Sequence, residues 1–337
     1  MNTRFATTTN TIKLAAALAA CASGTAFAQD AAASAPAGAP DNTHLPAAQQ
    51  THGLPTNWND TFVGYRYSNN FRFPGSAAKV AQNIGSLTTT GGFSLGSYYF
   101  NADYLISDRN NPEAGPDGVA GASGKQGAQE TYSVGHVEWS GSKILHEHLG
   151  AGFLRDVGIT TGYEWGTKND QFEQRAKMWM LGLTAEFAVP GYWNLTVGAR
   201  NEQNYNGITG VDLHYKTAWH VDSAWMIPFN AGPVPLTFKG FVAFTGPKGG
   251  DGFNVSTGVP EKTVTETLLR TSLLVDVGSL IGHPKALYVG PGYEYWNHMF
   301  GAPSTTGAFD PQTFQTTPVA NVGIKRSAAV FVAEAHF

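Results

Sequence analysis

The final stretch of the chain alternates in character at every second position. The odd positions are small or apolar and the even positions include the charges; they are Ala329, Phe331, Ala333, Ala335 and Phe337 against Val330, Val332, Glu334 and His336. Successive side chains of a β-strand point to opposite faces, so this stretch predicts a strand with one apolar face. Such a strand, closing on an aromatic residue, is typical of the last strand of a bacterial outer-membrane β-barrel.

The same alternation recurs in segments of about ten residues along most of the chain. Twelve strands are predicted, near residues 59–68, 86–94, 97–107, 129–139, 156–167, 174–187, 193–204, 209–226, 234–246, 263–277, 286–299 and 319–337. An even number suits closure of a single-chain bacterial barrel. Segments 86–94 and 129–139 fit either face, which leaves the count open by two strands. The predicted fold class is all-β, a transmembrane antiparallel up-and-down barrel.

The connections between these segments alternate in length. Short turns are predicted at 95–96, 190–191, 228–235 and 278–284, and long loops rich in Gly, Pro, Asn and Asp at 69–85, 108–128, 247–262 and 300–318. Barrels of this class have short periplasmic turns and longer external loops, so the long loops are expected outside the cell.

Alternation also separates a lipid-facing set from a lumen-facing set of side chains. Segment 211–222 shows it most cleanly, with Asp212, His214, Lys216, His220 and Asp222 at even positions. In the predicted strands the charges gather on one face, which we assign to the lumen. The predicted substrate-binding residues on that face are Tyr99, Asp103, Glu164, Arg200, Glu202, His214, Lys216, Lys239, Phe241, Glu266, Arg270, Glu294 and Trp296. Glu186, Asp276 and His298 have the same parity.

Two simpler roles compete with substrate binding for these residues. Acids and bases inside a barrel can pair across strands and only stiffen its wall. Aromatic residues at strand ends, such as Trp296 and Phe241, can belong to the girdles at the membrane interfaces.

The N-terminal residues predict export. Arg4 and Lys13 precede an apolar run at 14–20, and Ala26-Phe27-Ala28 offers a small-x-small cleavage site, so residues 1–28 are read as a signal peptide. A competing reading makes Cys21 a lipidated N-terminus. Residues 29–56 are rich in Ala and Pro and are expected to form a disordered periplasmic segment, and residues 57–337 the barrel.

Composition agrees with a barrel. The chain has 40 Gly, 12% aromatic and 14% charged residues, and a mean hydropathy of -0.19. The net charge of -4 argues against a polybasic nucleic-acid binder. Cys21 is the single cysteine, so cleavage after Ala28 would leave no disulfide and no thiol nucleophile.

Several strings resemble the Tsx-type nucleoside-specific channel family of outer-membrane proteins. They lie at 127–132, 155–158, 246–253, 266–270 with 276–278, and 288–296, within a resemblance that covers about residues 57–337. Membership would imply a monomeric twelve-stranded barrel with a narrow pore, nucleosides as cargo and a role as a phage receptor. No nucleoside-contacting residue of that family can be matched to a position of this chain.

The expected function is therefore a substrate-selective diffusion channel in the outer membrane of a Gram-negative bacterium, for small neutral or aromatic solutes such as nucleosides. The alternative is a surface receptor or structural barrel with an occluded lumen. Besides lipid, the strand ending in Phe337 is expected to engage the barrel-assembly machinery. Neither a cofactor nor catalysis is expected. A lipid hydrolase would need its histidine on the lipid-facing side, but nearly all strand histidines have lumen parity, and His146-Glu147-His148 suits a polar turn better than a metal site.

Overall fold

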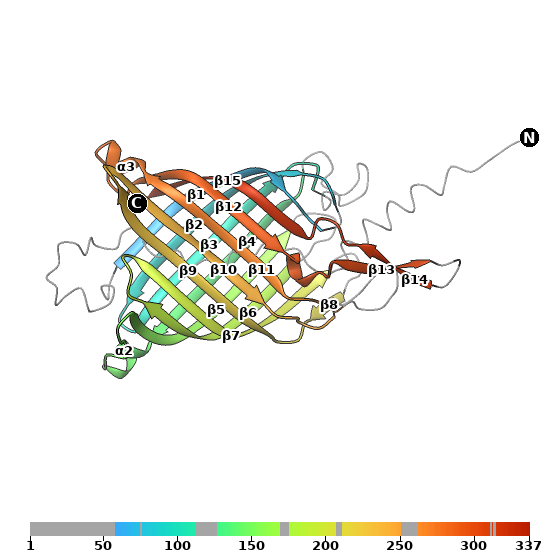
Figure 1. The fold of residues 1–337 in the computed structure, drawn as a ribbon, viewed down its shortest axis with the longest axis horizontal. Coiled ribbons are helices and arrows are strands. Elements are labelled where there is room, and N and C mark those ends of the chain that lie inside the picture. Colours follow the sequence, from blue (N-terminus) through green and yellow to red (C-terminus); the bar gives the residue numbers. More distant parts are fainter. Residues whose placement is uncertain are drawn as a thin grey trace, which may run out of the picture.

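Twelve antiparallel strands close into a barrel in the computed structural model of the chain (Figure 1). The structure describes residues 58–74, 76–111, 127–168, 175–206, 211–250, 262–310, 312 and 315–337. The predicted signal peptide and the Ala/Pro-rich segment lie outside these residues. The predicted fold class and the count of twelve strands are confirmed.

The barrel strands follow one another around the wall in chain order. They are β1 (Trp58–Phe71), β2 (Val80–Phe93), β3 (Gly96–Ser107), β4 (Gln129–Ser140), β5 (Leu154–Lys168), β6 (Arg175–Phe187), β7 (Tyr192–Asn206), β8 (Val211–His214) with β9 (Ala218–Ala231), β10 (Val234–Thr245), β11 (Glu266–Asp276), β12 (Leu287–Asn297) and β15 (Lys325–His336). Each pairs with its sequence neighbour, and β1 pairs with β15 to close the ring.

The ends of the barrel differ in their connections. Tight turns, the short helices α2 (Gly141–Leu145) and α3 (Val277–Leu280) and the C-terminus lie at one end, and β8 and the hairpin of β13 (Thr305–Asp310) and β14 (Gln315–Ala320) lie at the other (Figure 1). By the rule that periplasmic turns are short, the end with α2 and α3 faces the periplasm. The short helix η4 (Met299–Gly301) lies between β12 and β13.

Three predicted boundaries are wrong. β2 begins at Val80 inside a predicted loop, because Val80 and Gln82 are buried and the Gln82 amide donates to the Ser107 hydroxyl across the strand pair, at 3.1 Å. β9 runs through Pro228 to Ala231, so the turn to β10 is two residues long rather than eight. Residues 319–320 belong to the hairpin strand β14, and β15 begins at Lys325.

The outer face of the wall is apolar and the inner face is packed. On β6 the outward Trp179, Leu181 and Leu183 are 58%, 59% and 71% exposed, whereas the inward Met178 and Met180 are buried. A closed barrel with such an exterior is the structure of an integral outer-membrane protein, because closure pairs the backbone groups that lipid cannot.

No helix among the described residues is long and apolar enough to cross a membrane.

One barrel strand, formed by β8 and β9, is interrupted by a bulge. Gln203 of β7 pairs with His214 of β8, and Arg200 of β7 pairs with Ala218 of β9. Two residues of β7 lie between these pairs, but residues 215–217 make three on the other strand. One extra residue therefore enters the strand, and an insertion of one residue reverses the face that each later side chain takes.

The bulge overturns two predicted site residues. His214 and Lys216 were expected in the lumen, but both are exposed on the outer face, as is Asp212. Leu213 and Tyr215 take the inward positions and are buried. The segment does alternate, but the bulge turns its polar face outward. An outward polar face is tolerated here because the segment lies at the long-loop rim.

Candidate functional site

Eleven of the thirteen predicted site residues line the barrel interior. All are buried or largely buried; they are Tyr99, Asp103, Glu164, Arg200, Glu202, Lys239, Phe241, Glu266, Arg270, Glu294 and Trp296. Trp296 and Phe241 are both fully buried. The alternative that places these two rings in the lipid-facing girdles is therefore wrong.

Most of the lumen charges form ion pairs between strands. Arg200 lies 2.8 Å from Glu164, with both side chains about 2% exposed. Arg270 Nη2 lies 2.8 Å from Glu294, and Arg66 pairs with Asp103. The pair Arg270–Glu294 joins the neighbouring strands β11 and β12, whereas the other two pairs each reach across an intervening strand. The network therefore braces the wall, as the first of the two simpler roles predicts.

Several lumen residues outside the predicted set complete this network. Arg326 of β15 places Nη1 2.6 Å from Glu294 Oε1, so this one carboxylate holds two arginines. Lys239 lies 2.5 Å from Glu334, which also belongs to β15. Arg326 and Glu334 share the even parity of the last strand, so the sequence pattern itself could have found them.

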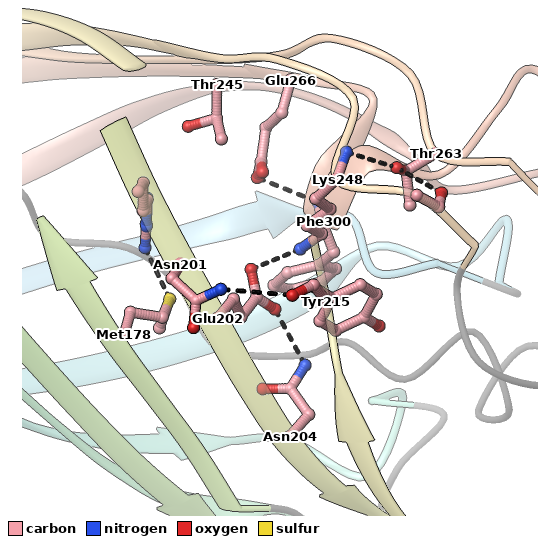
Figure 2. Close-up of polar contacts among 12 residues, drawn as sticks. Met178, Asn201, Glu202, Asn204, Tyr215, Thr245, Lys248, Thr263, Glu266 and Phe300 are labelled. Carbon is pink, nitrogen blue, oxygen red and sulfur yellow. Dashed lines mark hydrogen bonds and ion pairs between the residues drawn. The ribbon is translucent and has the colours of Figure 1, made fainter. Parts of the chain in front are cut away.

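The long-loop end of the lumen is filled by residues from two connections. Glu266 Oε1 accepts a hydrogen bond from the Trp296 indole at 2.6 Å. It also accepts one from the Phe300 backbone at 2.9 Å (Figure 2). The Phe300 and Trp296 rings meet edge to face, with centroids 4.7 Å apart. Lys248, from the connection after β10, reaches inward to pair with Glu202 (Figure 2).

We call Lys248, Met299 and Phe300 the mouth plug. All three are buried, although none belongs to a strand. The backbone of η4 is unusual here, since Phe300 has φ of 64°. A bulky residue with positive φ costs free energy, so the contacts with Glu266 and Trp296 must hold it in place. Sequence alternation gives no signal for residues that enter the lumen from loops.

A chamber of about 90 Å³ lies below the plug, between β1–β3 on one side and β10–β12 with β15 on the other. Its lining combines cationic heads with aromatic rings, and it includes Phe62, Arg66, Tyr99, Lys239, Phe241 and Arg270. A water molecule needs about 10–15 Å³ by the same measure, so the chamber has room for several. Glycines widen it: a Cβ on Gly64 would lie 2.3 Å from the Ser86 hydroxyl oxygen.

The opposite wall carries two buried histidines, His136 of β4 and His220 of β9. His220 Nδ1 lies 2.9 Å from the Thr245 hydroxyl, and its Nε2 lies 3.5 Å from Asp222. His136 packs over Gly162, where a Cβ would come within 2.6 Å of the imidazole ring. The predicted lumen position of His220 is confirmed, and His136 was missed.

Other acids and histidines with lumen parity have structural roles. Asp276 caps α3 by accepting from the Ser279 backbone at 2.9 Å. Glu186 lies 3.5 Å from Arg155 near the periplasmic end. His298 sits at the rim, with Nδ1 3.1 Å from the Thr265 carbonyl.

The periplasmic end is tied together by α2. The ammonium of Lys143 donates to the carbonyls of Phe93 and Gly96, each at 3.3 Å, which joins α2 to the turn between β2 and β3. Burial lowers the pKa of Lys143. His146, Glu147 and His148 follow α2 as exposed turn residues, and within the described ranges no group of three or more His, Cys, Asp or Glu side chains is placed to hold a metal.

No family model and no curated protein matches the chain. Among solved structures, the KdgM porin in complex with disordered oligogalacturonate is 8% identical, covers 82% of this chain and 99% of its own, and has a TM-score of 0.34. The NanC porin is 7% identical over 82% and 99%, with a TM-score of 0.36. The anion-selective porin from Comamonas acidovorans is 8% identical over 83% and 98%, with a TM-score of 0.29. Scores of this size carry no argument about cargo, so the nucleoside-channel family stays a resemblance.

Proposed function

We propose that this barrel is a narrow diffusion channel for small solutes across the outer membrane, with nucleosides as the favoured cargo. The proposal rests mainly on the chamber. Inside the closed wall, the cationic groups of Arg66, Lys239 and Arg270 lie beside aromatic rings, those of Phe62 and Phe241. A wall that only had to fill space would need no charges at such a cavity, since burying them is costly. The solute path runs from the mouth plug through the chamber to the turn end.

The chemistry of the chamber suits a nucleoside. The base presents a flat π-face, and stacking on an aromatic side chain contributes about 1–3 kcal/mol in single-stranded nucleic-acid sites. The ring of Phe241 faces the guanidinium of Arg270, with 5.7 Å between ring centroid and guanidinium carbon. Ribose hydroxyls can accept from Lys239 and Arg66. Contacts that are weak and serial let a solute leave as well as enter.

Passage requires the mouth plug to move. Phe300 and Trp296 fill the lumen at the level of Glu266, and the chamber is smaller than a nucleoside. We infer that Phe300 swings out with η4, because the strained φ of this residue is relieved when it leaves the lumen.

A second candidate is a barrel with a permanently closed lumen that acts as a surface receptor or a structural protein. The observation in its favour is the complete burial of Trp296 and Phe241 together with the ion pairs around Glu294. In this case the charge network would serve rigidity alone.

Single-channel current through the refolded chain in a planar bilayer separates the two. Adenosine, thymidine and a neutral sugar are titrated separately. Saturable block by the nucleosides and not by the sugar supports the nucleoside channel. A current indifferent to all three leaves a general channel and removes nucleosides as cargo. A folded barrel without current, with folding checked by its heat-dependent gel mobility, favours the receptor.

A further inference from the structure

Outward-facing basic residues are concentrated on one side of the barrel wall. Arg175 and Lys177 lie on β6, and His214 and Lys216 lie at β8 and the bulge that follows it; all four are exposed. We call these four residues the rim patch. The bulge creates half of it, because without the extra residue His214 and Lys216 would point into the lumen.

The register places the patch residues side by side. Lys177 pairs with Gln203 of β7, and Gln203 pairs in turn with His214. Neighbouring strands lie about 4.8 Å apart, so Lys177 and His214 are at the same height and about 10 Å apart. Arg175 lies one row closer to the rim, where its guanidinium carbon is 4.2 Å from the ring centroid of Tyr205. This cation–π contact holds the guanidinium on the outer face.

The rest of the wall does not repeat this feature. In the barrel strands as described, the only other exposed outward cation is Lys325 at the rim. The only outward acid is Asp212, which lies within the patch, because Asp212 pairs with Tyr205 in the row of Arg175. Lys325 is isolated over Tyr295, with 5.4 Å between its ammonium and the ring centroid. Within the described part of the chain, Arg175, Lys177 and Lys216 make no ion pair, in contrast to the cations of the lumen.

The patch lies where the apolar exterior ends. Below it on the same face of β6 come Trp179, Leu181 and Leu183, each more than half exposed. Trp219 of β9, 49% exposed, follows Lys216 by three residues. Tryptophan marks the membrane–water interface of membrane proteins, so the cations stand at the level of the lipid headgroups on the long-loop side.

We propose that the rim patch binds the phosphate groups of an anionic lipid of the outer leaflet. A guanidinium and two ammonium groups, on β6 and after β8 with only β7 between them, match a phosphorylated headgroup, and the Trp and Leu surface below them receives its acyl chains. A lipid bound here would be an annular partner of one side of the barrel. The proposal does not depend on what passes through the lumen.

Native mass spectrometry of the folded barrel in detergent tests the site. The protein is titrated with lipid A that carries two phosphates and with the same lipid without phosphate. The test variant combines Arg175→Gln, Lys177→Gln and Lys216→Gln, and the matched control is Lys325→Gln, which removes an outward cation elsewhere on the rim. Heat-dependent gel mobility verifies that each protein is folded.

Each basic residue near an anionic surface contributes about fivefold in affinity, so the triple variant is expected to bind diphosphorylated lipid A roughly 100-fold more weakly. Lys325→Gln should bind as wild type does. Equal affinity of the triple variant and wild type overturns the proposal, as does equal binding of the lipid without phosphate. Full displacement by millimolar inorganic phosphate overturns it too, because the site would then be one for free anions. If the triple variant fails to fold, Lys177→Gln and Lys216→Gln are measured singly, each with an expected loss of about fivefold.

Discussion

Arg326 and Glu294 form a buried ion pair at 2.6 Å between β15 and β12, with side chains 2% and 1% exposed. Arg326 also donates to the Arg72 carbonyl at 3.1 Å, and its guanidinium carbon lies 4.4 Å from the ring centroid of Phe71. One side chain thus connects the last strand to its neighbour and to the segment after β1, close to where the ring closes.

Removing Arg326 is expected to destabilise the barrel. Arg326→Met leaves Glu294 with Arg270 as its single arginine and leaves the Arg72 carbonyl without its donor, and loss of one partner of a buried pair costs about 3–5 kcal/mol. Urea unfolding in detergent micelles, followed by gel mobility, measures the change. Arg326→Lys keeps the charge but not the forked geometry, so an intermediate loss is expected. Equal stability of all three proteins would show that the pair is incidental.

Phe300→Ala is expected to raise the single-channel conductance. The substitution removes the ring that packs on Trp296 in the mouth plug, while Glu266 still accepts from the residue 300 backbone. Planar-bilayer recording measures the effect, with Phe300→Leu as a control that keeps apolar volume in the lumen. A conductance that stays at the wild-type value in Phe300→Ala would place the constriction elsewhere.

Phe241→Ala is expected to weaken block of the current by nucleosides. The ring lines the chamber and faces the guanidinium of Arg270, so its loss removes a stacking contribution of about 1–3 kcal/mol. Phe241→Tyr keeps a stacking face and should preserve block. Block of the current by nucleosides is also measured for Trp296→Ala, and weaker block there would show that the ring above the chamber contacts the solute too. Unchanged block in both alanine variants would remove these rings from the path.

The bulge predicts a reversal in labelling along a short segment. In a background without Cys21, Lys216→Cys should react with a bulky maleimide added to the folded barrel, and Leu213→Cys should not, because Leu213 points inward and is 8% exposed. Ala218→Cys, beyond the bulge, should be protected as well. Protection of position 216 together with labelling of position 213 would mean that the strand continues in regular register.

Much of this architecture follows from the alternation of side chains. β7 shows why: Asn194, Thr196 and Arg200 are buried, Leu195 and Val197 are exposed, and the sequence pattern assigns the same faces. The predicted faces are wrong only near a strand end, at the long-loop rim. Outside the membrane a strand can turn its polar face outward, and so the clean pattern of residues 211–216 predicted the wrong face.

The inward positions of loop residues cannot be predicted from side-chain alternation. Lys248 and Phe300 complete the lumen, yet they lie between strands, where no period constrains them. Their inward positions follow from tertiary contacts with Glu202 and Glu266. Of these four residues, the alternation places only the two acids in the lumen. The predicted strand ends near Val80 and Pro228 are wrong for a related reason, because cross-strand pairing extends β2 and β9 into segments that were predicted to be connections.

Closure of the ring joins residues that are far apart in the chain. His336 Nδ1 lies 3.0 Å from Asp60, 276 residues away, and the Phe337 amide donates to the Thr61 carbonyl at 3.0 Å. These contacts cannot form until the last strand has been delivered, and contacts of such long range fold slowly. Until β15 arrives, β1 and β12 each keep one edge with unpaired backbone groups, and such an edge can pair with another chain, so the unfinished barrel is the form of this protein most exposed to aggregation.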